Sequence, residues 1–293
     1  GLKPAPPTEP FRYHLHAYWR QLLTSNDVVR NELLNEFTTI AVTQARNHGL
    51  LQPDGPGSLT HPDRRRLIYG DGTIVRPRFK HRPDNPTARH DPSAANHPRH
   101  DGKIWGNNFV FISAREDRPY GRVLLALDRV PEPGAEAATA IKLIQHVHRI
   151  AGPGITAVTY DGAFQGAHHD TIMQTTGLVV INKPHLASRN NDQTGDTVKR
   201  RILGTHGHHT DHPDETCSHQ LAAINGRIAD VELADDGTPT VVSWAKRQQI
   251  KRAQRHNGTY RFNLALRFPC RHHNRDWDTW LSPHDDPENI RLL

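Results

Sequence analysis

The sequence has few cysteines, a single methionine and no long apolar segment. Its two cysteines, Cys217 and Cys270, are too few for a disulfide framework in a chain of 293 residues, which favours a reducing compartment. The longest apolar run, residues 123–127, is far shorter than the about 18 residues of a membrane-spanning helix. The N-terminal residues also lack the charged segment followed by an apolar segment that is typical of a signal peptide. The one methionine is Met173, so we expect a partial or processed chain. Together these absences predict a soluble, cytoplasmic protein with no membrane partner.

Positive charge is in modest excess and is concentrated in one segment. Lys and Arg number 37 against 31 Asp and Glu, a net charge of +6 that favours a polyanionic partner. Residues 237–275 contain nine Lys or Arg and no acid, and Trp244, Tyr260 and Phe262 are interleaved with them. Phosphate contacts combined with base stacking would suit such a segment, and a solvated basic face is the alternative. The DNA-binding candidates, at helical or tight-loop spacing, are Lys246, Arg247, Lys251, Arg252 and Arg255.

Hydrophobic periodicity near the N-terminus predicts a helix. Val29, Leu33, Phe37 and Ile40 recur at helical spacing, and Gly49 is available to end the helix. Its apolar face predicts either packing against the core or, less simply, a DNA-reading helix. Residues 52–62 are rich in proline and glycine and are typical of a linker.

The middle of the chain alternates between strand and helix periods. The predicted order is βββαβαβ, with a long polar loop over residues 76–102. Such an order indicates a mixed α/β sheet, in which later strands need helical crossovers. The expected strands are 67–75, 109–112, 122–127, 155–160 and 178–181, and the expected helices are 136–150 and 168–176. Short alternating segments after residue 184 predict a β-rich insertion.

Two aspartates follow apolar runs in the same local pattern. Asp71 and Asp161 each come after a tyrosine-containing strand and immediately before a glycine. Ligands gather near the carboxyl ends of strands in open α/β sheets, and paired carboxylates there are suited to Mg²⁺. Two such ions stabilise the attacking and leaving oxygens of a phosphoryl displacement. Since Asp-Gly also caps turns, the sequence leaves a metal site and a turn equally open. Asp128, at the end of the third strand, could face the same cleft.

Two Cys-x-His pairs offer a second metal-ligand pattern. They are Cys217 with His219 and Cys270 with His272, and four more histidines lie close upstream of the first pair, at positions His206, His208, His209 and His212. Together these residues could complete a tetrahedral zinc site that fastens the insertion. The spacing differs from the usual zinc fingers, and the chain contains 22 histidines. A His-rich loop with two buried thiols is therefore the alternative interpretation.

Several segments together resemble the DDE transposases of actinobacteria, which have a ribonuclease H-like catalytic core. The order and spacing of the segments carry the resemblance, over roughly residues 30–293. They are YGDGT at 69–73, GAEA at 134–137, TYDGA at 159–163 with Gly166, VINK at 180–183, CSH at 217–219, YRFN at 260–263, WLSP at 280–283 and PENIR at 287–291.

The resemblance implies a metal-dependent enzyme that cuts and transfers DNA strands during transposition of an insertion sequence. Asp71 and Asp161 match two of the three acids that hold Mg²⁺ or Mn²⁺ in such enzymes. The third, a Glu on a later helix, has no convincing match. Glu288 is the nearest candidate, in a proline-rich context, and we expect the true ligand to lie beyond Leu293. A homodimer acting on transposon ends and target DNA, in the nucleoid-associated cytoplasm, is also implied.

The expected organisation follows from these assignments. Residues 1–62 form a helical segment and linker, 63–186 the ribonuclease H-like catalytic core, 187–275 the β-rich basic insertion, and 276–293 an acidic tail leading to a missing helix. Two alternatives stay open: a non-catalytic DNA-binding derivative of a transposase, and a zinc-stabilised interaction module. A haloacid-dehalogenase-type phosphatase is disfavoured, because the position of its nucleophilic Asp is occupied by Tyr69, a phenol that cannot form an aspartyl-phosphate.

Overall fold

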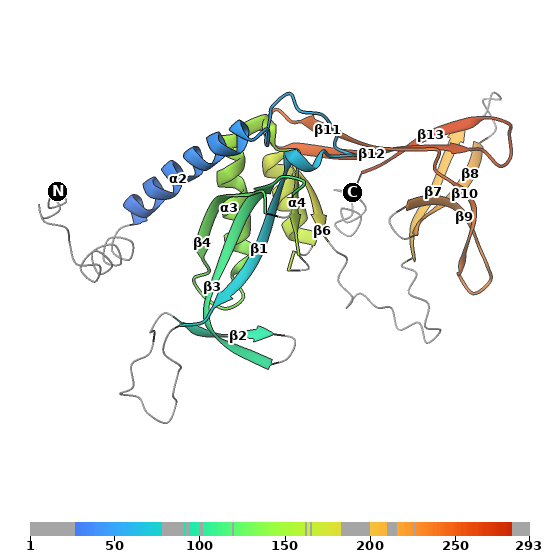
Figure 1. Ribbon diagram of the computed structural model, residues 1–293. Coiled ribbons are helices and arrows are strands. Elements are labelled where there is room, and N and C mark those ends of the chain that lie inside the picture. Colours follow the sequence, from blue (N-terminus) through green and yellow to red (C-terminus); the bar gives the residue numbers. More distant parts are fainter. Residues whose placement is uncertain are drawn as a thin grey trace, which may run out of the picture.

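The computed structural model describes residues 27–77, 91, 94–99, 102–118, 120–161, 163–164, 166–182, 200–209, 216–224 and 227–282. An α/β core lies at the centre, helix α2 extends from one side of it, and a β-rich arm extends from the other (Figure 1). Within the described ranges, none of the helices combines the length and the apolar character needed to cross a bilayer.

A mixed six-stranded sheet forms the core and confirms the predicted mixed α/β class. Its strand order is β2-β3-β1-β5-β6, with β4 also paired to β3. β1 pairs antiparallel with β3 and parallel with β5, so it lies at the change of direction in the sheet. The strands are β1 (Leu67–Val75), β2 (Ala95–Arg99), β3 (Gly102–Arg115), β4 (Arg122–Arg129), β5 (Ala157–Tyr160) and β6 (Val179–Asn182).

Two helices connect the parallel strands, as parallel pairing requires. α3 (Glu136–Ala151) precedes β5, and α4 (Gly166–Thr176) joins β5 to β6. α3 turns Leu143, Ile144 and Val147 toward the sheet, where they are buried. The helices cover one side of the sheet (Figure 1).

The prediction of an uninterrupted loop over residues 76–102 is wrong in part. β2 (Ala95–Arg99) lies inside it and pairs antiparallel with the first residues of β3. Its Asn, His and Pro content hides this strand from propensity, because pairing with a long neighbouring strand decides its conformation. Pro98 is compatible with a strand at the edge of the sheet, where one ladder bond can be missing. His97 is buried, with its Nε2 atom 3.1 Å from the carbonyl oxygen of Gly106.

Helix α2 (Asp27–Asn47) confirms the predicted N-terminal helix, but the predicted packing face is wrong. Leu33, Phe37 and Ile40 are exposed. The buried face is formed instead by smaller side chains, Thr38, Ala41, Val42 and Ala45. Small side chains let the helix axis approach β4 and α3 closely, and tertiary packing rather than local hydrophobicity therefore selects this face.

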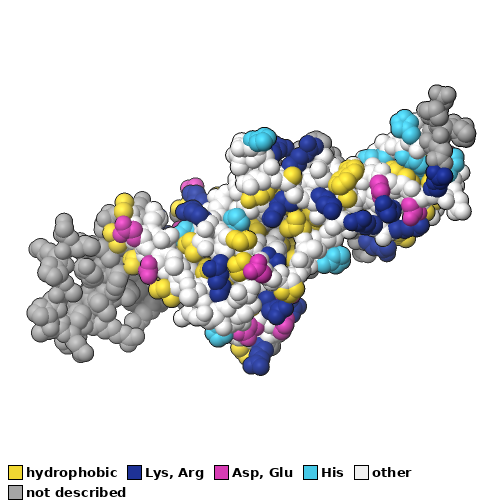
Figure 2. Space-filling model, turned by 90° about the horizontal axis from the view of Figure 1, so that it is seen from above, with side chains coloured by type: hydrophobic (Ala, Val, Ile, Leu, Met, Phe, Trp, Pro, Cys, Tyr) yellow, Lys and Arg dark blue, Asp and Glu magenta, His cyan; other side chains and the backbone are white. Residues whose placement is uncertain are grey.

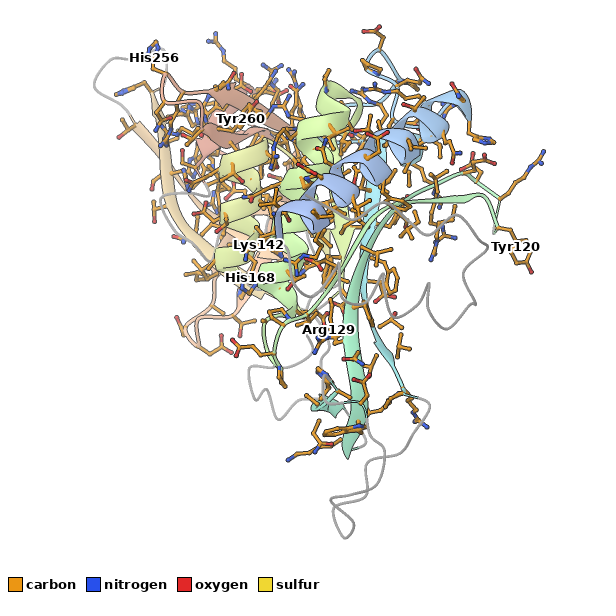
Figure 3. All side chains as sticks on the ribbon, turned by 90° about the vertical axis from the view of Figure 1, so that its left-hand side faces the viewer. Tyr120, Arg129, Lys142, His168, His256 and Tyr260 are labelled. Carbon is orange, nitrogen blue, oxygen red and sulfur yellow. The ribbon has the colours of Figure 1, made fainter. Side chains whose placement is uncertain are left out.

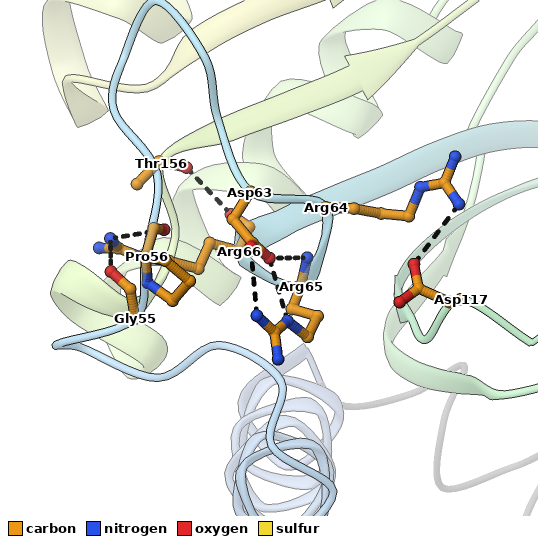
Figure 4. A network of polar contacts seen from close by, with 8 residues as sticks. All are labelled: Gly55, Pro56, Asp63, Arg64, Arg65, Arg66, Asp117 and Thr156. Atoms are coloured by element: carbon orange, nitrogen blue, oxygen red, sulfur yellow. Dashed lines mark hydrogen bonds and ion pairs between the residues drawn. The ribbon is translucent and has the colours of Figure 1, made fainter.

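The segment after α2 is anchored to the core by Arg66. Its guanidinium donates a hydrogen bond to the carbonyl oxygen of Gly55 at 2.7 Å (Figure 4). It also donates to the carbonyl oxygen of Pro153 at 2.8 Å. Leu51 is fully buried, and its N–H donates to the carbonyl of Arg65 at 2.8 Å. The described part of residues 1–62 therefore shares one hydrophobic cluster with the sheet.

The β-rich arm consists of two sheets. A four-stranded sheet has the order β10-β9-β8-β7, and a three-stranded sheet has the order β11-β12-β13. The strands are β7 (Arg200–His209), β8 (Thr216–Ile224), β9 (Arg227–Leu233), β10 (Pro239–Trp244), β11 (Arg247–Gln254), β12 (Tyr260–Pro269) and β13 (Asp276–Leu281). β13 pairs with β12, so the first residues of the expected acidic tail belong to this sheet, and residues 283–293 lie outside the described part.

The β11–β12 hairpin bridges the core and the distal sheet. Its turn lies beside α4, and its other end reaches β13 and the four-stranded sheet (Figure 1). Phe262, Leu264, Leu266 and Phe268 alternate along β12 and are buried. The period-2 pattern therefore gives this hairpin one apolar face, and that face joins the core cluster.

Candidate functional site

The two predicted aspartates follow the paired part of two neighbouring parallel strands. β1 and β5 pair from Leu67 beside Ala157 to Tyr69 beside Thr159. Asp71 lies two residues further along β1, and Asp161 is the residue that directly follows β5. Both side chains are exposed. Parallel pairing is what makes this possible, because it puts equivalent points of two βα units at one edge of a sheet.

A buried tyrosine lies between these carboxylates and a third. Tyr160, only 2% exposed, stacks on Phe164 at 4.1 Å and donates its hydroxyl hydrogen to Glu136 Oε1 at 3.3 Å. Burial raises the pKa of Tyr160 well above its usual range, and the negative charges of Glu136, Asp161 and Asp71 raise it further. The hydroxyl of Tyr160 therefore stays protonated in the folded chain, in a strongly negative environment.

Glu136 is the site residue that sequence reasoning missed. It opens α3, and its Oε2 atom accepts a hydrogen bond from the Asn108 side chain at 2.8 Å. Its carboxylate packs over Gly72, where an added Cβ atom would lie 2.4 Å from Oε1. Glycine at this position thus allows the carboxylate to sit against β1, on the face of the sheet opposite to the Asp71 side chain. The available signal was the GAEA segment at 134–137, which places an acid in the first turn of a helix.

The turn interpretation of Asp161 is confirmed by its contacts. Its Oδ1 atom accepts a hydrogen bond from the Ala163 N–H at 2.9 Å, as a turn-capping aspartate does. Among the described residues, neither Asp71 nor Asp161 belongs to a group of three possible ligands whose atoms lie within 4.8 Å. A divalent cation held here would therefore take part of its coordination from water or from a substrate phosphate.

Asp128 caps the end of its own strand. Its Oδ1 atom accepts a hydrogen bond from the Arg129 N–H at 2.8 Å. β4 is separated from β1 by β3, where Asp128 pairs with Val110. It therefore offers a matched comparison for Asp71, since it is an acid of the same sheet two strands away.

The four predicted zinc residues are brought together at the end of the arm. Ligand atoms of Cys217, Cys270 and His272 lie within 4.8 Å of one another, and Cys270 Sγ is 3.5 Å from His219 Nε2. His208, which the sequence pattern did not single out, joins His219 and Cys270 in a second such group. Burial lowers the pKa of His219, which favours the neutral imidazole that metals require.

Three of the predicted basic residues, Arg247, Lys251 and Arg252, lie on strand β11, so the expected helical spacing is wrong for them, whereas Lys246 precedes the strand and Arg255 lies in the turn that follows it. Lys246 directly precedes β11 and pairs with Asp276, and Arg247 donates to the side chain of Gln249 at 2.6 Å. Arg252 donates to the carbonyl of Gly177 at 2.6 Å. Lys251 and Arg255 are exposed.

Opposite charges accompany these basic residues on the arm. Figure 2 shows Lys and Arg side chains spread over the core and the arm, with acids among them on the arm. His256 lies in the β11–β12 turn, close to Tyr260 at the start of β12 (Figure 3). The positive residues of the hairpin that are not engaged in contacts within the described structure, Lys251 and Arg255, are thus its main candidates for phosphate contacts.

Glu288, the nearest sequence candidate for a third acid, lies outside the described residues. Comparisons with protein-family models, with curated proteins and with solved structures find no match for this chain. The functional argument therefore rests on the residues and geometry above.

Proposed function

We propose that the protein is a metal-dependent phosphoryl-transfer enzyme acting on DNA, with a ribonuclease H-like core of the DDE transposase type. The observation that carries the proposal is the parallel pairing of β1 and β5, because Asp71 and Asp161 each follow its last pair, Tyr69 with Thr159, by two residues. In-line displacement at a phosphate needs positioned metal ions more than covalent help, and paired carboxylates supply that position.

The topology supports the ribonuclease H-like part of the proposal. The strands of the core follow the order β4-β3-β1-β5-β6, antiparallel on one side of β1 and parallel on the other. This is the arrangement that the βββαβαβ order of the transposase resemblance requires. β2 is an addition to it, at the outer end of β3.

We assign separate roles to the residues of the site and of the hairpin. Asp71 and Asp161 would hold Mg²⁺ or Mn²⁺, which activates water for strand nicking and then a 3′-hydroxyl for strand transfer. Glu136 fixes the Tyr160 hydroxyl and the Asn108 amide, and so keeps the wall behind the two aspartates rigid. Lys251 and Arg255 are placed to contact the DNA backbone, which would make binding fall with salt.

Metal-dependent nicking of supercoiled plasmid tests the proposal directly. We expect Mg²⁺- or Mn²⁺-dependent nicking that falls by about 100-fold or more in Asp71→Asn and Asp161→Asn, because each removes a charged metal ligand. Asp128→Asn, the matched control, should keep wild-type nicking. Unchanged nicking in both site variants would show that the assignment is wrong.

One observation favours a second candidate, a non-catalytic DNA-binding derivative. The described residues place no third ligand close enough to complete a site with Asp71 and Asp161. Mn²⁺ binding, measured by electron paramagnetic resonance, separates the candidates. DNA binding without Mn²⁺ binding or nicking would favour the derivative, whereas Mn²⁺ binding that is lost in Asp71→Asn would favour the enzyme.

A further inference from the structure

We propose that the arm contains a structural Zn²⁺ site whose ligands are His208 Nε2, His219 Nε2, Cys217 Sγ and Cys270 Sγ, with Asp230 as a positioning residue. Of these five residues, Asp230 has no counterpart in the sequence pattern, and His208 is one of several histidines that the sequence could not tell apart. The site lies at the far end of the arm from β1 and β5 (Figure 1), and the proposal stands independently of the phosphoryl-transfer site.

Strand register assembles the ligands. His208 on β7 is the cross-strand partner of Cys217 on β8, and His219 lies two residues further along the same face of β8. Cys270 follows β12 directly, and its N–H is bonded to the Arg275 carbonyl at 2.7 Å, which closes the turn before β13. The four ligands thus come from both sheets of the arm.

The distances around Cys270 match those of a tetrahedral metal site, and Cys217 belongs to a second group of possible ligands that shares Cys270. His208 Nε2 lies 3.3 Å from Cys270 Sγ, and His219 Nε2 lies 3.5 Å from the same sulfur. Zinc–sulfur and zinc–nitrogen bonds of about 2.3 and 2.0–2.1 Å at a tetrahedral angle place the two ligand atoms about 3.6 Å apart. Two imidazole nitrogens therefore already converge on one thiol at the spacing that a zinc ion would impose.

Hydrogen bonds hold both imidazoles in the tautomer that binds metal. His219 Nδ1 is 2.7 Å from Asp230 Oδ2, and His208 Nδ1 is 3.2 Å from the backbone oxygen of His209. Both of these partners only accept hydrogen bonds, so each Nδ1 carries the proton and each Nε2 presents a lone pair to Cys270. In protein zinc sites, the ring nitrogen of a histidine ligand that does not bind the metal often donates a hydrogen bond to a carboxylate.

Further contacts hold Asp230 and the two histidine rings in place. Asp230 and His219 are both fully buried, and Arg271 Nη2 lies 3.5 Å from the other carboxylate oxygen of Asp230. Trp277 stacks on the rings of His219 and His208, with centroid distances of 4.6 and 5.2 Å. Burying a charged pair such as Asp230 and Arg271 costs desolvation free energy. Here the buried carboxylate of Asp230 orients a metal ligand, His219.

Four protein ligands and this burial point to a structural rather than a catalytic ion, because no coordination position remains open for a substrate. The ion would fasten the β12–β13 turn to β7 and β8. Cys217 and Cys270, only 6% and 8% exposed, would bind the ion as thiolates.

The test measures metal on the full chain. We expect about one zinc per chain by elemental analysis, and replacement by Co²⁺ should produce the intense visible bands of tetrahedral coordination together with thiolate charge transfer. Zinc should also protect both cysteines from a thiol reagent. Wild-type protein that binds neither metal tightly, or whose cobalt spectrum lacks tetrahedral and thiolate bands, would overturn the proposal without any variant.

Variants then test the ligand set. Cys270→Ser, Cys217→Ser and His208→Gln should each weaken zinc binding by about 100-fold or more, and Asp230→Asn by about 10–100-fold. His273→Gln, exposed in the same turn, should bind zinc as the wild type does. His272, which also reaches Cys270, provides the rival fourth ligand: loss of binding in His272→Gln with retention in Cys217→Ser would overturn the assignment of Cys217.

Discussion

Arg252 was expected to bind DNA, but its contacts predict a role in holding the arm to the core. Its Nη1 atom donates to the carbonyl of Gly177, at the end of α4, at 2.6 Å, and its guanidinium lies 5.3 Å from the centre of the Tyr260 ring. Gly177 has a φ of 70°, and Tyr260 ring atoms would lie 3.0 Å from an added Cβ. The hairpin thus docks on a glycine that leaves room for both side chains.

The perturbation is Arg252→Ala, and its magnitude follows from these two contacts. A hydrogen bond from a charged donor contributes about 1.5–3 kcal/mol, and an exposed cation–π contact about 0.5–1 kcal/mol. Because Arg252 is exposed, the lower values apply, for a loss of about 2 kcal/mol in the free energy of unfolding. In a chain of this size the melting temperature should fall by about 4–8 °C.

The assay is thermal and urea unfolding, with Lys251→Ala as the matched control. The Lys251 side chain is exposed and forms no hydrogen bond or ion pair with the described residues, so its removal should change stability by less than about 0.5 kcal/mol. If Lys251 contacts a phosphate, its removal should lower the salt dependence of DNA binding by about one unit of slope. Equal unfolding of the two variants would refute the docking role of Arg252.

Three further perturbations have defined outcomes. Gly72→Ala would place a Cβ 2.4 Å from Glu136 Oε1, so we expect a loss of about 1–3 kcal/mol in stability and reduced nicking, whereas wild-type melting and nicking would contradict this packing. Burial and the charge of Arg252 lower the pKa of His148 below its usual 6.5, so the folded chain binds fewer protons there than the unfolded chain. Urea unfolding should therefore show stability falling as pH drops below 6.5, with a shallower fall in His148→Gln; identical pH profiles would exclude this cause. Phe262→Ala should cost about 3–5 kcal/mol because it empties a fully buried position, and a loss below about 1 kcal/mol would show that the arm is packed differently.

Local sequence patterns were sufficient for the order of the core elements. Apolar alternation in β1, β3 and β4 and the helical period of α3 mark these segments before any contact is known. The repeated pattern of a strand followed by Asp and Gly likewise identified Asp71 and Asp161, since both signals lie within a few neighbouring residues.

Local patterns failed where a neighbouring element decides the outcome. β11 is rich in Lys, Arg and Gln and has no clear period, yet it is a strand because β12 pairs with it along its whole length. β2 is a strand for the same reason. On α2 the larger apolar residues predicted one face, and close packing of alanines against β4 and α3 selected another.

Some of the candidate zinc residues could be identified from the sequence, and others only from the structure. Cys217, His219, Cys270 and His272 could be named from two Cys-x-His pairs, but His208 could not be told apart from the other histidines nearby in the chain. The register of β7 against β8 singles it out, because it places His208 opposite Cys217. Asp230 has no local signal, since its contact with His219 joins two strands.

The sequence by itself determined the class of fold, the order of its elements and the two aspartates, because these depend on periodicity and turn chemistry within short windows. Only the tertiary structure decided which residues meet: β1 with β5 through parallel pairing, Glu136 with Tyr160, and two histidines with Cys270. Such meetings depend on strand register and on packing across many residues, where a shift of one position turns a side chain to the opposite face.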